Sequence, residues 1–596
     1  MRVQKTARRT GTTREHGSFT ACETIYVCAA RCRSEGKPLI RRASALASVL
    51  PPKGVVGYDV IVFVGLERYL QHRQREEIRE ELARQGIVLS EGEISRLGHL
   101  FLRYLEALHE SRADRLREAL EKDGGWPLHV DATGEGGRGT LLVVFAGWRP
   151  WVLGAWKIPT ERADAILPRL TAVVGRFGAP CALMRDLGRA VTEACNTLVA
   201  SLGGTIPVLA CHQHLLADVG GDLLAESYGQ LRELFRRFGV KAGLRALARD
   251  LGRGLGTDIA DARKAFCSWQ GRADEGHVIP GGQAGLAVVR AMSQWVLDHH
   301  TEGHDQGFPY DLPYLAFLDR CVTARRAADA FTRRLPDDKS VCKALERLRR
   351  LLEPTVSEVP FSQVSRTLRA RAEIFNELRD ALRLRPKLSG RTTTTSTPVS
   401  TTQLAEELRD IEASIKQLSD SLAARRPERG PAQDKRRAID IVLTHLDKHG
   451  PFLVGHIVRL SVAAGGTTRI VDRTNNRLES FFDRMKRGER RRSGRKNLAQ
   501  DLEQMPPAAA LVPNLLSPEY VSLVCGSIDK LPQAFAALDA RSRSRSSLVM
   551  QAAAHTLTAT DCDVVSASLP TADRILIRTG DMATRLRAAA GSRAPR

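Results

Sequence analysis

The chain has 596 residues, a formal net charge of +22 and 27% charged residues. Its length exceeds what one hydrophobic core can hold, so we expect several domains. The composition is that of a globular protein, and no apolar run approaches the roughly 20 residues of a membrane helix, which argues against a membrane partner. The excess of Lys and Arg suits a polyanionic partner, with nucleic acid as the first candidate.

Residues 1–50 are basic, and we expect them to be irregular. The 11 cysteines of the chain are an odd number and widely scattered, which fits free thiols in a reducing compartment. Cys22, Cys28 and Cys32 lie near His16, but their spacing is not that of the CxxC pairs in structural zinc sites. Free thiols are therefore the favoured interpretation of this cluster, and a metal site is the alternative.

Residues 51–123 have a helical pattern in two parts, separated at Gly86. Ser90 and Glu93 have the spacing of a capping box at the start of the second helix. The apolar positions that recur at helical spacing are Ile78, Leu82, Ile94, Leu97, Phe101 and Leu105. Two helices joined by a short turn predict a helix-turn-helix that binds DNA, and a plain helical hairpin is the alternative.

Residues 124–222 change to an α/β pattern. The predicted strands are 128–133, 140–146, 151–158, 182–184 and 206–211, and the predicted helices are 160–177 and 188–202. Three strands followed by helix, strand, helix and strand are typical of a layered α/β domain. We therefore expect a mixed five-stranded sheet.

Two acidic residues belong to this sheet. Asp131 lies inside the first predicted strand, where burying an unpaired charge is costly, and Asp186 directly follows the fourth. In RNase H-like sheets the first and fourth strands are neighbours, so the two carboxylates would meet and persist best with metal ions between them. Two Mg²⁺ or Mn²⁺ ions there would activate a water or a 3′-hydroxyl. A solvated strand end is the alternative for each residue, and Asp218 or Asp222 could replace Asp186.

Residues 223–465 are expected to form a helical insertion without strands. Residues 389–402 are rich in Thr and Ser and predict a linker. The helix predicted at 404–424 has apolar residues at alternating steps of four and three, namely Leu404, Leu408, Ile411, Ile415, Leu418 and Leu422. This heptad pattern predicts packing within the chain, with a dimeric coiled coil as the alternative.

Residues 466–500 contain a helix expected from Thr474 to near Gly488, with Glu479 in its first turn. Asn476 and Glu479 also have the spacing of a capping box, which would give Glu479 a purely structural role. The basic residues that follow are Arg484, Lys486, Arg487, Arg490, Arg491, Arg492, Arg495 and Lys496. They would bind DNA phosphates, with a solvated tail as the alternative. Residues 501–596 give no functional prediction.

Two groups of possible soft ligands need separate interpretation. Cys211 and His214 form a C-x-x-H pair, but the sequence offers no obvious further zinc ligands, so a structural thiol and histidine are favoured. The cluster Asp298, His299, His300 and His304 lies in a polar stretch and is interpreted as a solvated loop rather than a metal site.

Four short motifs resemble those of one enzyme family. They are His129–Thr133, Met184–Asp186, Cys211–His214 and Thr474–Phe482, in this order along the chain. The chain resembles the DDE transposases of bacterial insertion sequences, in members with an all-helical insertion in an RNase H-like core. The resemblance implies a catalytic and metal-binding triad of Asp131, Asp186 and Glu479, with Asp483 as the next candidate for the third acid. Several such families also carry a C-x-x-H pair after the second acid.

The function implied by this resemblance is cleavage of the ends of a mobile element and transfer of its strands to target DNA. A homodimer or larger oligomer on double-stranded DNA, in the cytoplasm and associated with the nucleoid, is expected. A structure-specific nuclease on the same fold and a non-catalytic, domesticated DNA-binding protein are the alternatives.

Overall fold

The computed structural model describes residues 2–28, 33–34, 37–38, 40–42, 44–253, 255, 282–298, 307–333, 337–384, 401–430, 432–460, 466 and 468–541. The chain divides into two compact units, which are described separately. The first unit comprises Met1–Gly11, Thr20–Val55 and Ala536–Arg596, and the second comprises Thr12–Phe19 and Val56–Phe535.

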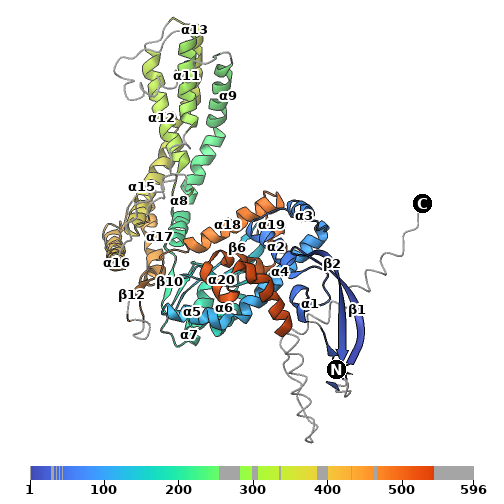
Figure 1. Ribbon diagram of the computed structural model, residues 1–596. Coiled ribbons are helices and arrows are strands. Elements are labelled where there is room, and N and C mark those ends of the chain that lie inside the picture. Colours follow the sequence, from blue (N-terminus) through green and yellow to red (C-terminus); the bar gives the residue numbers. More distant parts are fainter. Residues whose placement is uncertain are drawn as a thin grey trace, which may run out of the picture. The chain divides into compact units, whose positions relative to one another are not determined.

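The N-terminal residues form strands, so the expectation of irregular structure was wrong (Figure 1). A three-stranded sheet contains β1 (Arg2–Thr13), β2 (Gly17–Val27) and β5 (Ile40–Arg41), and β3 (Arg33–Ser34) pairs with β4 (Lys37–Pro38). A short helix, α1 (Ser44–Val49), follows. Most side chains of β1 are exposed, so apolar alternation did not reveal it. Cys22 is a free thiol, and Cys32 lies outside the described residues.

Helices occupy the region where a helix-turn-helix was predicted. They are α2 (Tyr58–Gly65), η1 (Leu66–Leu70), α3 (Arg75–Arg84), α4 (Glu91–Ser111) and α5 (Ala113–Lys122). The predicted apolar positions of α3 and α4 are buried. Ser90 caps α4 by accepting from the Glu93 amide at 3.1 Å, but the Glu93 carboxylate pairs with Arg96, so the predicted capping box is only half formed. DNA recognition by α3 and α4 stays a prediction.

The sheet of the second unit has five strands in mixed orientation, which confirms the predicted architecture. They are β6 (Pro127–Glu135), β7 (Arg138–Ala146), β8 (Trp151–Lys157), β9 (Ala182–Arg185) and β10 (Val208–Ala210), in the order β10-β9-β6-β7-β8. β6 pairs antiparallel with β7 and parallel with β9. The first and fourth strands are therefore neighbours, as expected.

Helices pack on both sides of this sheet (Figure 1). α6 (Ala163–Phe177) and α7 (Arg189–Ser201) lie on one side, and α18 (Asn476–Ser493) and α19 (Ala499–Gln504) lie on the other. The chain continues through η6 (Pro507–Leu516), α20 (Pro518–Val524) and η7 (Ile528–Lys530). Of the described helices, none is by itself long and apolar enough to cross a membrane; one bent pair, Pro507–Leu516 with Pro518–Arg541, passes on length and composition alone.

A helical region separates β10 from α18, as predicted. It contains α8 (His212–Arg237), α9 (Val240–Gly252), α11 (Gly282–Leu297), α12 (Pro313–Thr332), α13 (Lys339–Leu352), α14 (Pro354–Ser357), α15 (Val359–Ala381), α16 (Thr401–Ala424), α17 (Gln433–His449) and η4 (Gly450–Phe452). The expectation of no strands before 465 was wrong, because β11 (Ile457–Arg459) pairs antiparallel with β12 (Thr468–Ile470). Each strand has only three residues, too few for a sequence pattern.

The heptad residues of α16 pack inside the chain. Ile411, Ile415, Leu418 and Leu422 are buried in one apolar core together with residues of α15 and α17. This confirms the intramolecular interpretation of the seam, while Leu404 at its start is exposed. The buried positions of the seam are therefore not available for the dimeric coiled coil that was the alternative.

Candidate active site

The first two predicted acids belong to neighbouring strands, Asp131 within β6 and Asp186 directly after β9. The pairing of β6 with β9 places Pro127 opposite Ala182 and His129 opposite Met184. Continued by two residues, this register places Asp131 opposite Asp186. Asp131 is 8% exposed and accepts a hydrogen bond from the Ala132 amide at 2.8 Å. Asp186 is half-buried and accepts from the Gly188 amide at 3.1 Å.

The third predicted acid, Glu479, lies in the first turn of α18, which contacts β6. Burial raises the pKa of the Asp131 carboxyl to about 7, and the negative charges of Asp186 and Glu479 act in the same direction. His214 opposes this rise with a positive charge. Because all three charges act on Asp131, the three acids lie within electrostatic range of one another. The structure therefore brings together the residues that the sequence singled out.

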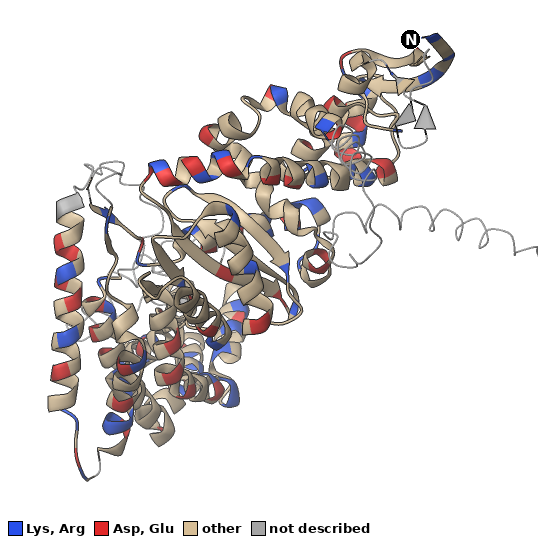
Figure 2. Ribbon diagram, turned by 90° about the horizontal axis from the view of Figure 1, so that it is seen from below, with Lys and Arg blue, Asp and Glu red and all other residues tan. Residues whose placement is uncertain are grey.

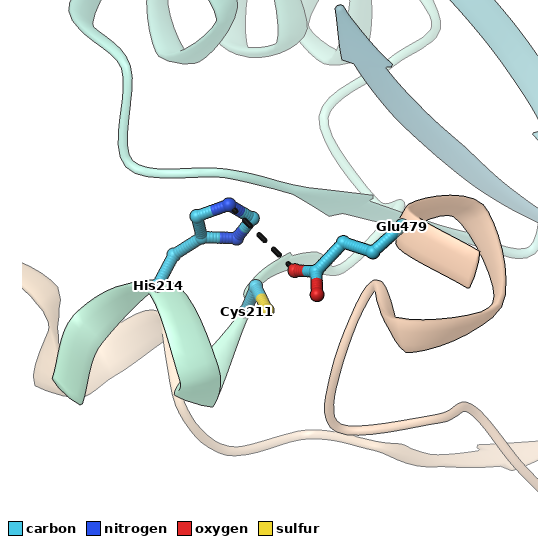
Figure 3. Close-up of side chains that lie close together, drawn as sticks. All are labelled: Cys211, His214 and Glu479. Carbon is cyan, nitrogen blue, oxygen red and sulfur yellow. Dashed lines mark ion pairs between the residues drawn. The ribbon is translucent and has the colours of Figure 1, made fainter. Parts of the chain in front are cut away.

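His214 and Cys211 join this cluster from the start of α8 (Figure 3). The His214 Nε2 lies 3.8 Å from Oε1 of Glu479. The Cys211 sulfur, a His214 ring nitrogen and a Glu479 oxygen lie within 4.8 Å of one another and could hold a metal ion. The prediction of an isolated structural pair was thus incomplete, since the third candidate ligand, Glu479, comes from a segment far away in the sequence.

The environment of the His214 imidazole favours its protonated form. Burial by itself lowers its pKa, but the hydrogen bond and charge of Cys211, followed by the charges of Asp131 and Glu479, outweigh burial and raise the pKa to about 10. His214 therefore supplies a cation that offsets part of the negative charge of the acids.

Asn475 connects the elements that carry the site, and sequence reasoning missed it. It is fully buried at the start of α18. Its Oδ1 lies 2.9 Å from Nδ1 of His129, and its Nδ2 donates to the Val130 carbonyl at 3.5 Å, so both bonds reach β6. Its backbone amide donates to the Cys211 sulfur at 3.3 Å. Asn475 thereby fixes the start of α18 against β6 and α8, which positions Glu479.

The predicted capping box of Asn476 and Glu479 is absent from this described region. Asn475 is the N-cap residue, and the Glu479 amide donates to the Asn475 carbonyl at 2.9 Å. With Asn475 as the N-cap, Glu479 is the fourth helical residue and not the third, which a capping box requires. One residue corresponds to a turn of about 100° around a helix, and the Glu479 carboxylate lies near His214 instead of the helix start. The purely structural role considered for Glu479 was therefore wrong in its geometry.

The alternative acids differ in their environments, and one of them lies near the site. Asp222 is engaged by His445, with 2.9 Å between Oδ2 and Nε2. Asp218 on α8 is half-buried and lies within electrostatic range of the site: burial raises its pKa, the charges of Asp222 and Asp186 act in the same direction, and the charges of His445 and His214 oppose them. Asp483, one turn after Glu479, is exposed. Asp298 accepts from Gln294 at 2.9 Å, and His299, His300 and His304 lie outside the described residues.

The predicted DNA-binding residues extend along the second half of α18 and beyond it. Three of the eight are in ion pairs within the chain: Arg490 with Glu135, Arg492 with Glu489 and Arg495 with Asp501. The Lys486 ammonium donates to the Gly134 carbonyl at 3.0 Å. The exposed remainder is Arg484, Arg487, Arg491 and Lys496. Elsewhere, Lys and Arg alternate with Asp and Glu along the helices (Figure 2).

No family model matches the chain, and neither does any curated protein or solved structure. The interpretation of the site therefore depends on its own geometry and charge.

Proposed function

We propose that the chain is a metal-dependent enzyme of the RNase H-like class that cuts DNA. More particularly, we propose that it is a transposase that cleaves the ends of a mobile element and transfers the cut strands. One observation carries this proposal: Asp131, Asp186 and Glu479 converge from β6, the end of β9 and α18, and Asp131 is buried with its pKa raised to about 7. Such an accumulation of negative charge is typical of a site that is completed by cations.

The residues present fit Mg²⁺ or Mn²⁺. Three carboxylates provide the oxygen ligands that these ions prefer, and Asp131, Asp186 and Glu479 would hold one or two of them. When bound, the ions would activate a water or a 3′-hydroxyl and stabilise the leaving oxygen. The Nε2 atom of His214 lies 3.8 Å from Oε1 of Glu479 and the pKa of His214 is raised, so its protonated ring would present a positive charge to a phosphate at this site.

Binding of DNA next to the acids is supported by α18 itself. Its exposed Arg484, Arg487 and Arg491 follow Glu479 on the same helix. Phosphate contacts by such side chains give salt-dependent affinity without base recognition. Sequence recognition is assigned to α3 and α4, where α4, capped by Ser90, is the candidate recognition helix.

The experiment is a cleavage assay on a supercoiled plasmid that carries the coding sequence with its natural flanking DNA. We expect nicked and joined products with Mg²⁺ or Mn²⁺ and none with EDTA. Asp131→Asn should bind the plasmid without cutting it, because the substitution removes a charge and hardly changes the shape. Asp114→Asn, which alters an exposed acid of α5, is the matched control and should cut normally.

Each other outcome has a defined meaning. Normal cutting by Asp131→Asn, or cutting in EDTA, would exclude the proposed site. Cleavage without joined products would support the structure-specific nuclease. Binding of DNA without any cleavage by the wild-type protein would support a non-catalytic DNA-binding protein.

A further inference from the structure

A cavity of about 300 Å³ lies at the far end of α18 from Glu479. Residues of three segments line it: the η1–α3 region, α4, and the stretch from the end of α18 to η6. The lining residues are Arg68, Tyr69, Arg75, Ser95, His99, Arg492, Ser493, Arg495, Asp501, Gln504, Met505 and Pro506. Four arginines and one aspartate therefore face the cavity, and its volume is at the small end of ordinary ligand pockets.

Arg68 is the most unusual residue of this cavity. It is only 6% exposed, and its Nε and Nη1 atoms have no hydrogen-bond partner within the described chain. Gly98 on α4 leaves room for its side chain, since a Cβ at that position would lie 2.9 Å from Cδ of Arg68. A buried guanidinium with two unpartnered nitrogens is costly unless a ligand satisfies them. The fold thus holds an arginine in a place where the protein alone does not complete its bonding.

The other charges of the cavity do not neutralise Arg68. Arg492 is occupied by Glu489, whose side chain accepts from its Nε at 3.1 Å. Arg495 lies 3.6 Å from Asp501, and Arg75 lies 3.6 Å from Glu91. Glu489, Asp501 and Glu91 are thus each paired with an arginine other than Arg68. The charge of Arg68 is therefore the excess positive charge of the cavity.

We propose that this cavity binds a phosphate group, with Arg68 as the central donor. The planar guanidinium offers paired N–H donors that match two phosphate oxygens, and arginines are the usual ligands of phosphate in proteins. Arg75 and Arg495 at the half-exposed rim supply further donors. The phosphate belongs either to a DNA strand or to a small phosphorylated molecule; only this choice of carrier rests on the proposed function.

The first experiment measures thermal stability with inorganic phosphate, compared with chloride at equal ionic strength. Phosphate should raise the melting temperature of the wild-type chain by at least about 2 °C, because a ligand that binds only the folded state stabilises it. Arg68→Met should lose this shift. The Met side chain has a similar length and no charge, so the variant is expected to melt no lower than the wild type without phosphate.

A second pair of variants keeps the test independent of the buried position. Arg75→Gln changes a rim residue of the cavity and should reduce the phosphate shift by at least half. Arg79→Gln is the matched control: it lies on the same helix and next to the same partner, Glu91, but it does not line the cavity. Equal phosphate shifts in all four proteins, or no phosphate shift in the wild type, would overturn the proposal.

The second experiment distinguishes the two carriers without metal and without cleavage, so its outcome is independent of the enzyme activity. Fluorescence anisotropy compares one 20-base-pair duplex carrying 5′-phosphates or 5′-hydroxyls. If Arg68→Met binds only the phosphorylated duplex about tenfold more weakly, the cavity holds a terminal phosphate; if it binds both more weakly, it holds an internal one. If Arg68→Met binds both duplexes as tightly as the wild type but its melting temperature no longer rises with phosphate, the cavity binds a small phosphorylated molecule.

Discussion

The two ends of helix α18 differ in the sign of their surplus charge. Its first turn brings Glu479 to Asp131, Asp186 and His214, where negative charge is in excess. Its last turn contains Arg490, Arg491 and Arg492 and borders the cavity around Arg68, where positive charge is in excess. The helix dipole favours this arrangement, since its positive end lies near the acids and its negative end near the arginines.

The dipole does not by itself explain why, at each end of α18, the side chains of one charge are not fully neutralised by side chains of the opposite charge. At the first turn the charges of Asp131 and Glu479 act on His214, and the charge of Asp186 acts on Asp131. At the last turn two nitrogens of Arg68 have no hydrogen-bond partner among the described residues. Under the two proposals above, the ends would bind ligands of opposite charge, a cation at one and a phosphate at the other. Metal-bound DNA would supply both.

The largest expected effect is a difference in DNA cleavage between variants of two acids of α18, Glu479 and Asp483. Glu479→Gln should lower the rate of DNA cleavage more than about 100-fold. Mutation of a residue that only hydrogen-bonds to a metal ligand commonly lowers activity about 10–100-fold, and loss of a ligand itself should have a larger effect. Asp483→Asn, on the same helix but exposed, should cleave at the wild-type rate. Plasmid cleavage in Mg²⁺ measures both rates. Similar losses in the two variants would remove the distinction between Glu479 and its neighbour.

The second effect concerns stability at the acidic end. Asp131→Asn should raise the free energy of unfolding by about 2 kcal/mol in metal-free buffer at pH 8, because it removes a buried charge that faces two like charges. The folded-state pKa of Asp131 is raised, so its ionisation costs stability as the pH rises through about 7, and the gain should shrink as the pH is lowered towards 4. Denaturant titrations at both pH values check this, and a destabilised variant at pH 8 would contradict it.

The third effect concerns the exposed arginines that follow Glu479. Arg484→Ala combined with Arg487→Ala should weaken DNA binding about tenfold and reduce the slope of log affinity against log salt by about two. The matched control is Arg409→Ala with Lys416→Ala on α16, which removes the same charge from the insertion. Equal losses in both double variants would show that only net charge matters.

The smallest effect tests whether surplus charge is confined to the two ends of α18. His109 on α4 is buried between the Tyr520 hydroxyl, 2.8 Å from its Nδ1, and the Leu153 carbonyl, 3.2 Å from its Nε2. Burial lowers its pKa to about 4, so the folded state keeps it neutral. As the pH falls below about 6.5, His109 binds a proton in the unfolded chain but not in the folded chain, so the free energy of unfolding decreases.

His109→Gln should therefore make the dependence of unfolding free energy on pH shallower, by up to about 1 kcal/mol per pH unit between pH 6.5 and 5. His16→Gln, the same substitution at a half-exposed position, serves as the matched control. Urea titrations at several pH values measure this slope. An unchanged slope in His109→Gln would mean that the histidine titrates normally inside the fold.

The sequence predicted the sheet because its strands are local apolar runs bounded by Gly, Pro and polar residues, and local patterns need no knowledge of distant contacts. The same local argument placed Asp131 and Asp186 at strand positions, and strand adjacency brought them together. The N-terminal strands were not predicted, because most side chains of β1 are exposed and polar and the strand has no apolar face that a sequence pattern could reveal.

The rest of the site depends on contacts between distant segments. Asn475 was not predicted because its bonds reach His129, Val130 and Cys211, hundreds of residues earlier in the chain. The cavity was missed for the same reason, since Arg68 and Arg492 meet only after folding. A buried arginine also contradicts the usual expectation that Arg lies at the surface, so nothing in composition could have indicated it.

The length of α18 has a geometric consequence for a DNA strand that is bound at both ends of this helix. Thirteen positions separate Glu479 from Arg492, which corresponds to about 20 Å along an α-helix. Successive phosphates of one strand of a duplex are about 3.4 Å apart along its axis, so this length equals roughly six nucleotides. A helix cannot be stretched or shortened to suit a substrate. With an internal phosphate in the cavity, α18 would act as a spacer that fixes how many nucleotides lie between the phosphate that is held and the phosphate that is cut.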